Sequence, residues 1–267
     1  MPIGVFDSGV GGLTVLKAMR DLLPNEDLVY LGDTARLPYG TKSPESISRY
    51  ASQATLQLQQ QGIKLLVVAC NTASAVALDT LREHMHPLPV IGVVEPGATA
   101  AVEACPGGNH LVLATEATVQ LGAYRNAILQ RDAGGEVREL ACELLVSLAE
   151  EGWTDGAIAE DIVRRYLEPL AETSYVPDSI ILGCTHFPLL RSAIEAVVPA
   201  GTTIVDSAST TAGFARHMLD EDGLLNDQSA AGRLRLLATD GATRFARVGG
   251  RFLDERLVAA DIELVDL

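Results

Sequence analysis

Short apolar runs alternate along the chain with segments in which apolar residues recur at helical spacing. The runs predict strands at 3–6, 27–32, 64–69, 88–93, 110–115, 136–140, 179–183, 202–206 and 233–239. The segments between them predict helices near 11–23, 44–61, 73–85, 117–131, 155–173, 187–198 and 208–220. Runs that are apolar throughout are typical of parallel strands covered by helices on both faces. The alternation therefore predicts an α/β fold.

One pattern occurs twice. LLVVACNT (65–72) and SIILGCTH (179–186) each place a cysteine where an apolar run ends and a helix is predicted to follow. A single (β/α)8 barrel would also suit the length, but the repeat favours two smaller units. Catalytic groups in such sheets lie at the carboxyl ends of strands. We therefore expect two pseudo-symmetric α/β lobes with mostly parallel sheets and an active site in the cleft between them.

The two cysteines of this pattern, Cys70 and Cys184, are the first candidates for catalysis. Each is expected at or just before a helix N-terminus, where amide groups and the helix dipole favour a thiolate. A single free cysteine is often only a buried core residue, but two in the same setting favour a functional role. His186 could polarise the neighbouring thiol or a substrate. Cys105 and Cys142 lack this setting and are interpreted as structural.

Polar residues follow other predicted strands. FDSGVGGLTV (6–15) is a strand end, a glycine turn and a helix start, without the spacing of a dinucleotide or Walker motif. It could be no more than a tight turn, but Asp7 could orient a thiol or a substrate ammonium group, and Ser8 could bond a carboxylate. The polar loop 32–43 is either an ordinary connection or one wall of a substrate site.

Composition excludes several classes of function. The chain has 267 residues, a net charge of -15 and no run rich in Lys or Arg, which argues against nucleic-acid binding. We expect no signal peptide, no membrane span and no disulfide framework, and hence a cytoplasmic protein. None of the three lysines has a convincing pyridoxal-phosphate setting, and C-x-x-C and H-E-x-x-H motifs are absent. We expect neither cofactor nor metal.

Two thiols that face one substrate suit a two-base reaction at a carbon centre. One thiolate removes a proton from one face, and the other thiol returns a proton to the opposite face, which inverts the configuration. The α-proton of an amino acid is weakly acidic, so the enolate-like charge needs preorganised donors. Asn71, Thr72 and Thr185 lie where such donors are needed. Thr115 and Thr118 either cap the next helix or offer hydroxyls to a carboxylate.

Four blocks, FDSGVGGLTV, GDTARLPYG, ACNTASAVAL and GCTHFPLL, resemble the signature sequences of the cofactor-independent glutamate racemase family. The resemblance implies that Cys70 acts as base on D-glutamate, with help from Asp7, and Cys184 on L-glutamate, with help from His186 and Glu150. It also implies these substrate contacts: Asp7, Ser8, Pro38, Tyr39, Gly40, Asn71, Thr72, Thr115, Thr118, Thr185 and His186.

The same resemblance implies discontinuous lobes, residues 1–97 with 211–267 and residues 98–210, and a product, D-glutamate, that is used in peptidoglycan synthesis. We expect L- or D-glutamate as the small-molecule partner, neither nucleic acid nor a membrane, and a homodimer as one possible assembly. The sequence itself leaves the oligomeric state open.

The segment CELLVSLAEEG (142–152) departs from that family's pattern, since Glu143, Leu145 and Ser147 stand where Pro, Phe and Pro are usual. Either Glu150 or Glu151 could therefore assist Cys184, and the loss of two prolines could loosen the segment. Three alternatives stay open: aspartate or another acidic substrate, a zinc site built from both cysteines with His186 and Asp7, and a protein that binds its ligand without turnover.

Overall fold

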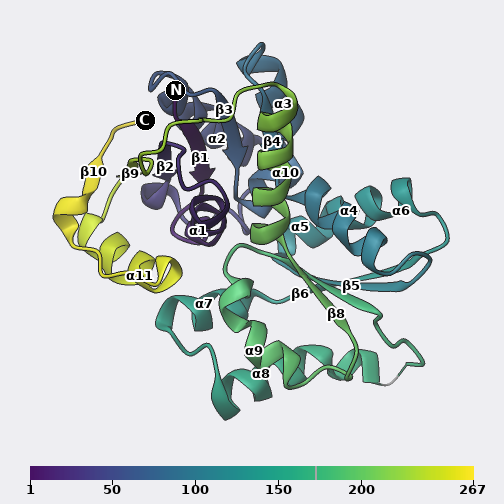
Figure 1. The fold of residues 1–267 in the computed structure, drawn as a ribbon. Helices are drawn as coiled ribbons and strands as arrows, with labels where there is room; N and C mark the ends of the chain where they lie inside the picture. The colour runs from purple at the N-terminus through teal and green to yellow at the C-terminus, as the bar shows by residue number, and fades with distance from the viewer. Residues whose placement is uncertain (172) are drawn as a thin grey trace. The chain divides into compact units, whose positions relative to one another are not determined.

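The structure is a computed structural model that describes residues 1–171 and 173–267 (Figure 1). Its contacts divide the chain into two compact units, Met1–Val93 with Ala208–Leu267, and Val94–Ser207. The boundaries expected from the sequence, 97/98 and 210/211, fall inside the helices α4 (Val94–Ala104) and α10 (Ser207–Glu221). Residue 172, which belongs to the predicted helix 155–173, lies outside the described residues.

The first unit is built on a six-stranded parallel sheet in the order β10-β9-β2-β1-β3-β4. Its strands are β1 (Ile3–Asp7), β2 (Leu28–Gly32), β3 (Leu65–Val68), β4 (Val90–Gly92), β9 (Leu234–Ala238) and β10 (Ile262–Leu264). The strands β1 to β4 are buried throughout. Because all the strands are parallel, their carboxyl ends meet at one edge, and the residues that follow them become neighbours.

Helices cover both faces of this sheet. α1 (Leu13–Leu22) packs against α11 (Ala242–Leu253), and α2 (Pro44–Gln59) packs against α3 (Asn71–Met85), as Figure 1 shows. Two short 3-10 turns, η1 (Thr34–Arg36) and η3 (Ala259–Asp261), complete the connections. The apolar faces of α2 and α3 form one core with the sheet, and this core reaches Cys70 itself.

The second unit has a four-stranded parallel sheet in the order β6-β5-β7-β8. Its strands are β5 (Asn109–Ala114), β6 (Glu136–Ala141), β7 (Ser179–Gly183) and β8 (Thr203–Asp206), and its other elements are α5 (Glu116–Gln120), α6 (Ala123–Arg131), α7 (Glu143–Glu151), α8 (Gly156–Ala171), η2 (Phe187–Leu190) and α9 (Arg191–Glu195). α4 packs against α6, while α7 contacts η2 and α8 contacts α9 (Figure 1).

The α/β class and all nine predicted strands are confirmed, and the two separate sheets exclude the single barrel. The structure adds β10, α4, α7 and α11, which the sequence analysis did not predict. The predicted helix 117–131 is interrupted at Gly122, whose φ of 60° is left-handed. Pro96 lies in the first turn of α4, where proline removes no helical hydrogen bond. In the described parts of the chain, no helix has the length and apolar character needed to cross a membrane.

Candidate active site

Cys70 lies between β3 and α3, at the carboxyl edge of the first sheet. It is the N-cap residue of α3, and its sulfur accepts a hydrogen bond from the Ala73 amide at 3.4 Å. The Ser8 hydroxyl lies 3.5 Å from the same sulfur. An amide donor and the positive end of a 15-residue helix both favour a thiolate. The position that the sequence predicted, at a helix N-terminus, is therefore confirmed for this cysteine.

Asp7 ends β1 beside β3. Its Oδ2 accepts the Gly9 amide at 2.8 Å, and the side chain is almost fully buried. The Tyr30 hydroxyl donates to the Gly9 carbonyl at 2.9 Å. Burial raises the pKa of Tyr30, and the nearby negative charges of Asp7 and of an ionised Cys70 raise it further. The Tyr30 hydroxyl therefore stays protonated. The structure thus brings Asp7, Ser8 and Cys70 to the same edge.

Gly12 explains why this turn is rich in glycine. Its backbone is an ordinary helical one, so a left-handed conformation is not the reason. A Cβ at this position would lie 2.5 Å from the Cβ of Asp7 and 3.0 Å from that of Ala69. The missing side chain lets the start of α1 pass directly over the strand ends that carry the candidate groups.

The loop after β2 is anchored by Asp33, which the sequence analysis did not single out. Asp33 is buried, and its carboxylate accepts hydrogen bonds from Tyr39 at 2.6 Å, from the Arg36 Nε at 3.0 Å and from Thr239 at 2.9 Å. Its amide also donates to the Asp7 carbonyl at 3.0 Å. The sequence signal was a carboxylate directly after a buried strand.

Tyr39 belongs to the core of the first unit, since only 1% of it is exposed. Burial and the Asp33 charge raise the pKa of its hydroxyl, which therefore remains a donor. Pro38 is exposed and Gly40 is half-buried. Of these three residues, Tyr39 is the one whose side chain is held in the core, bonded to Asp33.

Cys184 follows β7 at the carboxyl edge of the second sheet. Its sulfur lies 3.7 Å from the Nδ1 of His186, and the His186 Nε2 lies 3.3 Å from the Glu150 Oε1. The side chains of His186 and Glu150 are 12% and 18% exposed, whereas Glu151 is exposed. Of the two neighbouring glutamates, Glu150 is therefore the one whose carboxylate contacts this imidazole.

The helix predicted near 187–198, just after Cys184, is confirmed only in part. The chain continues into the 3-10 turn η2 and the short α9, and His186 precedes the first residue of that turn. Pro188 at the start of η2 has no amide to donate. Cys184 thus faces an imidazole where Cys70 faces a helix amide.

Hydroxyl and amide groups gather beside each cysteine. Thr115 is the N-cap residue of α5 but makes no side-chain cap; its hydroxyl lies 3.1 Å from that of Thr118. Thr185 adjoins Cys184, and its hydroxyl lies 3.5 Å from the His186 Nδ1. In the first unit, Asn71 and Thr72 form the first turn of α3 and are buried.

Cys142, interpreted from the sequence as structural, is fully buried at the start of α7. Burial, with the charges of Glu143 and Cys184, raises the pKa of its thiol to about 12. A thiol of that kind stays protonated and unreactive at neutral pH. Cys105 is half-buried, and its sulfur contacts the Asp178 carbonyl at 3.6 Å.

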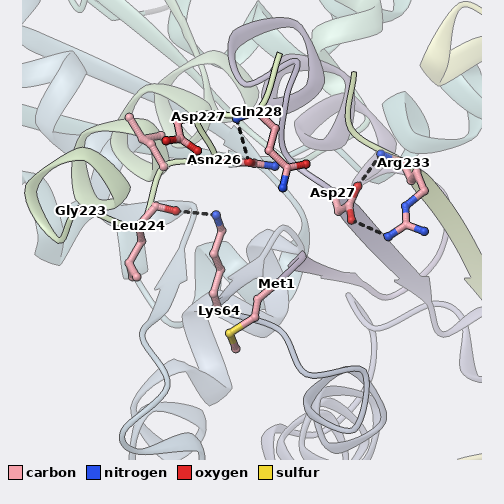
Figure 2. A pocket seen from close by; sticks show the side chains of 10 residues that line it. Met1, Asp27, Lys64, Gly223, Leu224, Asn226, Asp227, Gln228 and Arg233 are labelled. Atoms are coloured by element: carbon pink, nitrogen blue, oxygen red, sulfur yellow. Dashed lines mark hydrogen bonds and ion pairs between the residues drawn. The ribbon is translucent and has the colours of Figure 1, made fainter. Parts of the chain in front are cut away.

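A pocket of about 520 Å³ opens at the opposite, amino edge of the first sheet (Figure 2). It is lined by Met1, Asp27, Lys64, residues 223–228 and Arg233. Three of its charged groups pair with neighbours: the Lys64 Nζ lies 2.6 Å from the Leu224 carbonyl, and Arg233 bonds Asp27 at 3.0 Å, as the dashed lines in Figure 2 mark. These contacts tie the 223–233 segment to the sheet.

Metal binding was an alternative for the cysteines. In residues 1–171 and 173–267, no three His, Cys, Asp or Glu side chains are grouped so that they could hold a metal ion.

Residues 3–215 match the profile of the family described as Asp/Glu/hydantoin racemase. The chain belongs to this racemase family. A glutamate racemase of Geobacter metallireducens is 47% identical over 96% of this chain and 93% of that relative, and one of Chlorobaculum parvum is 43% identical over 100% and 96%. The predicted family membership is therefore confirmed.

Solved racemase structures share the fold. A glutamate racemase from Bacillus anthracis superimposes with a TM-score of 0.93 at 37% identity, over 100% of this chain and 97% of that one. A glutamate racemase from Francisella tularensis in complex with D-glutamate gives 0.90 at 36% identity, over 99% and 97%. An aspartate racemase from Picrophilus torridus, with a TM-score of 0.59 at 18% identity, shares the fold alone.

Proposed function

We propose that this protein is a glutamate racemase that works without a cofactor. The observation that carries the proposal is the placement of two cysteines at the carboxyl ends of β3 and β7, each beside a different set of groups that favour proton transfer. Relatives named glutamate racemase that match over nearly the whole chain support glutamate as the substrate.

In the proposed reaction, Cys70 and Cys184 act on opposite faces of one α-carbon. With D-glutamate, the Cys70 thiolate removes the α-proton and the Cys184 thiol donates a proton, so that L-glutamate leaves with Cys70 protonated and Cys184 ionised. That state is the one needed to start from L-glutamate. The reverse turnover, or exchange with water, restores the first state.

The helpers differ between the two thiols. The Ala73 amide and the α3 dipole stabilise the Cys70 thiolate, with Asp7 and Ser8 at the same edge. His186, oriented by Glu150, accepts a proton from the Cys184 thiol or returns one to it.

The substrate carboxylates need donors that are already in place. We propose that Ser8, Asn71, Thr72, Thr115, Thr118 and Thr185 bind them through hydroxyl and amide groups, with backbone contacts from 38–40. Donors that need not reorganise stabilise the enolate-like charge most strongly. The two compact units would then be the two lobes of the enzyme, a cytoplasmic protein that supplies D-glutamate for peptidoglycan synthesis.

The test is racemisation in D2O without added cofactor. Purified protein should convert L- or D-glutamate to the racemate, with α-deuterium appearing in the NMR spectrum as the optical rotation falls. Cys70→Ala and Cys184→Ala should each abolish the fall in optical rotation, and Cys105→Ala should show the same fall as the wild type. Turnover of aspartate in place of glutamate would identify aspartate as the substrate. Binding of glutamate without exchange of its α-proton would refute the proposed racemase activity.

The role of Glu150 has its own matched pair. Glu150→Gln should lower kcat about tenfold or more, because His186 loses the charge that stabilises its protonated form. The slowed step should also raise the isotope effect seen with α-deuterated L-glutamate. Glu151→Gln, one residue along and exposed, should change neither quantity. Equal effects of the two substitutions would exclude Glu150 as the helper.

A further inference from the structure

Glu143, one of the residues that depart from the family's usual sequence, makes a contact that the proposed reaction has not used. It is the first residue of α7, and its Oε1 accepts a hydrogen bond from the main-chain amide of Glu116. Glu116 is in turn the first residue of α5. The carboxylate of one helix start thus caps the amide of another.

That amide lies between the two threonines proposed to bind a substrate carboxylate. Thr115 precedes it, and Thr118 is two residues further on. Their hydroxyls lie 3.1 Å apart, and both residues are buried. The Thr115 side chain does not cap α5, so the Glu143 carboxylate supplies the cap from outside the helix.

We call the residues around Cys70 the first half-site and those around Cys184 the second half-site. Contacts at both ends of α7 hold this helix beside the second half-site. At its start, Cys142 directly follows the last residue of β6, and its amide donates to the Ala114 carbonyl at 2.9 Å. Also at its start, the Leu144 amide donates to the Tyr166 hydroxyl of α8 at 3.0 Å. Near its other end, Glu150 lies beside His186. A shift of α5 relative to α7 would therefore move the threonines relative to the Cys184 helper.

We propose that Glu143 is a positioning residue for substrate binding: its bond to the Glu116 amide holds Thr115 and Thr118 in place for the carboxylate of glutamate. The inference rests on the proposed racemase function. It assigns to Glu143 a role in substrate affinity and none in the proton transfer, since the cysteine and its imidazole lie elsewhere on the same edge.

The surroundings of Glu143 disfavour its charged form. Burial and the nearby charge of Glu116 raise its pKa, while the hydrogen bond to the amide lowers it. Burial raises the pKa values of the Cys142 thiol and the Tyr166 hydroxyl, and the charge of Glu143 raises both further. A neutral acceptor of the same shape would keep the hydrogen bond and remove this repulsion.

The test compares Glu143→Ala with Glu143→Gln in the racemase assay. Glu143→Ala should raise KM for both enantiomers about tenfold, the loss expected when a hydrogen bond to a charged group worth about 1.5 kcal/mol is removed. Its kcat should stay within about twofold. Glu143→Gln should restore KM to within about threefold of the wild-type value. Glu116→Gln, which leaves the amide in place, serves as the control and should behave as wild type.

Hydrogen exchange adds a readout that does not depend on turnover. The Glu116 amide should exchange faster in Glu143→Ala and at the wild-type rate in Glu143→Gln. An unchanged KM in Glu143→Ala, or a fall in kcat that Glu143→Gln does not rescue, would overturn the inference while leaving the racemase intact. A wild-type protein that does not racemise glutamate would refute the function first, and the inference with it.

Discussion

The loop after β2 gives the sharpest test of how the first half-site is held. Asp33 is fully buried and joins Tyr39, Arg36 and Thr239. We predict that Tyr39→Phe and Asp33→Asn are each destabilising and that their effects are not additive. The double variant should lose less stability than the two single variants together, because both substitutions act on the same hydrogen bond: Tyr39→Phe removes its donor and Asp33→Asn removes the charge of its acceptor.

The magnitudes follow from the contacts. The Tyr39 hydroxyl donates to a carboxylate at 2.6 Å, and such a bond is worth about 1.5–3 kcal/mol net. Asp33→Asn removes that charge and leaves the Arg36 guanidinium, only 19% exposed, without its partner, a change that costs about 3–5 kcal/mol when the charge is fully buried. Arg36 also stacks on the Tyr50 ring at 4.6 Å, so we expect about 3 kcal/mol. The coupling energy should be about 1–2 kcal/mol.

Urea unfolding of the four proteins measures this cycle. Asp27→Asn is the matched control, since Asp27 also bonds an arginine, but its side chain is 32% exposed and that of Arg233 is 86% exposed. A surface pair of this kind contributes about 0–1 kcal/mol. Equal losses for Asp33→Asn and Asp27→Asn, or a coupling below about 0.5 kcal/mol, would show that Asp33 does not anchor the loop.

Two further predictions concern buried positions. His110 is fully buried, its Nδ1 lies 2.7 Å from the Ser179 Oγ, and burial lowers its pKa, so the folded state favours the neutral ring. As the pH falls below the ordinary pKa of about 6.5, the wild-type protein should lose about 1.4 kcal/mol of unfolding free energy per unit of pKa difference between the folded and unfolded states. Urea titrations at pH 7.5 and 5.5 should show this loss in the wild type and not in His110→Gln. Gly12→Ala should lower kcat at least tenfold, because the added Cβ displaces Asp7. In the control Gly213→Ala no atom lies near the added carbon, so activity should be kept and the unfolding free energy should rise by about 0.5–1 kcal/mol. A Gly12→Ala enzyme with wild-type kcat would contradict the close contact.

The strands were predictable because the parallel sheets bury both faces, which leaves continuous apolar runs. The missed helices have physical reasons. α4 begins in a Glu-Pro-Gly stretch that favours a turn, although proline is tolerated in a first turn. The strongly amphipathic α11 has Gly249 and Gly250 in its interior. A Cβ at Gly249 would lie 2.7 Å from Leu13, so this glycine allows α11 to pack closely against α1.

The candidate site was predictable in part. Residues beside the cysteines could be named because the chain passes directly from a strand end to the polar group. Asp33 was missed because its partners come from the loop after it and, in Thr239, from the turn after β9, more than 200 residues away. Glu143 was recognised only as a departure from a pattern, since its partner is a main-chain amide of another helix. Contacts of that kind leave no spacing in the sequence.

The two cysteines occupy equivalent ends of their strands but are not equivalent chemically. β3 passes through Cys70 directly into a 15-residue helix, so the Ala73 amide and a dipole that does not titrate serve this sulfur. β7 passes into a 3-10 turn, and a histidine serves Cys184 instead. L- and D-glutamate have equal free energy, so a racemase gains nothing from one strong base and one weak acid. The imidazole and Glu150 would then supply in the second half-site what the helix start supplies in the first.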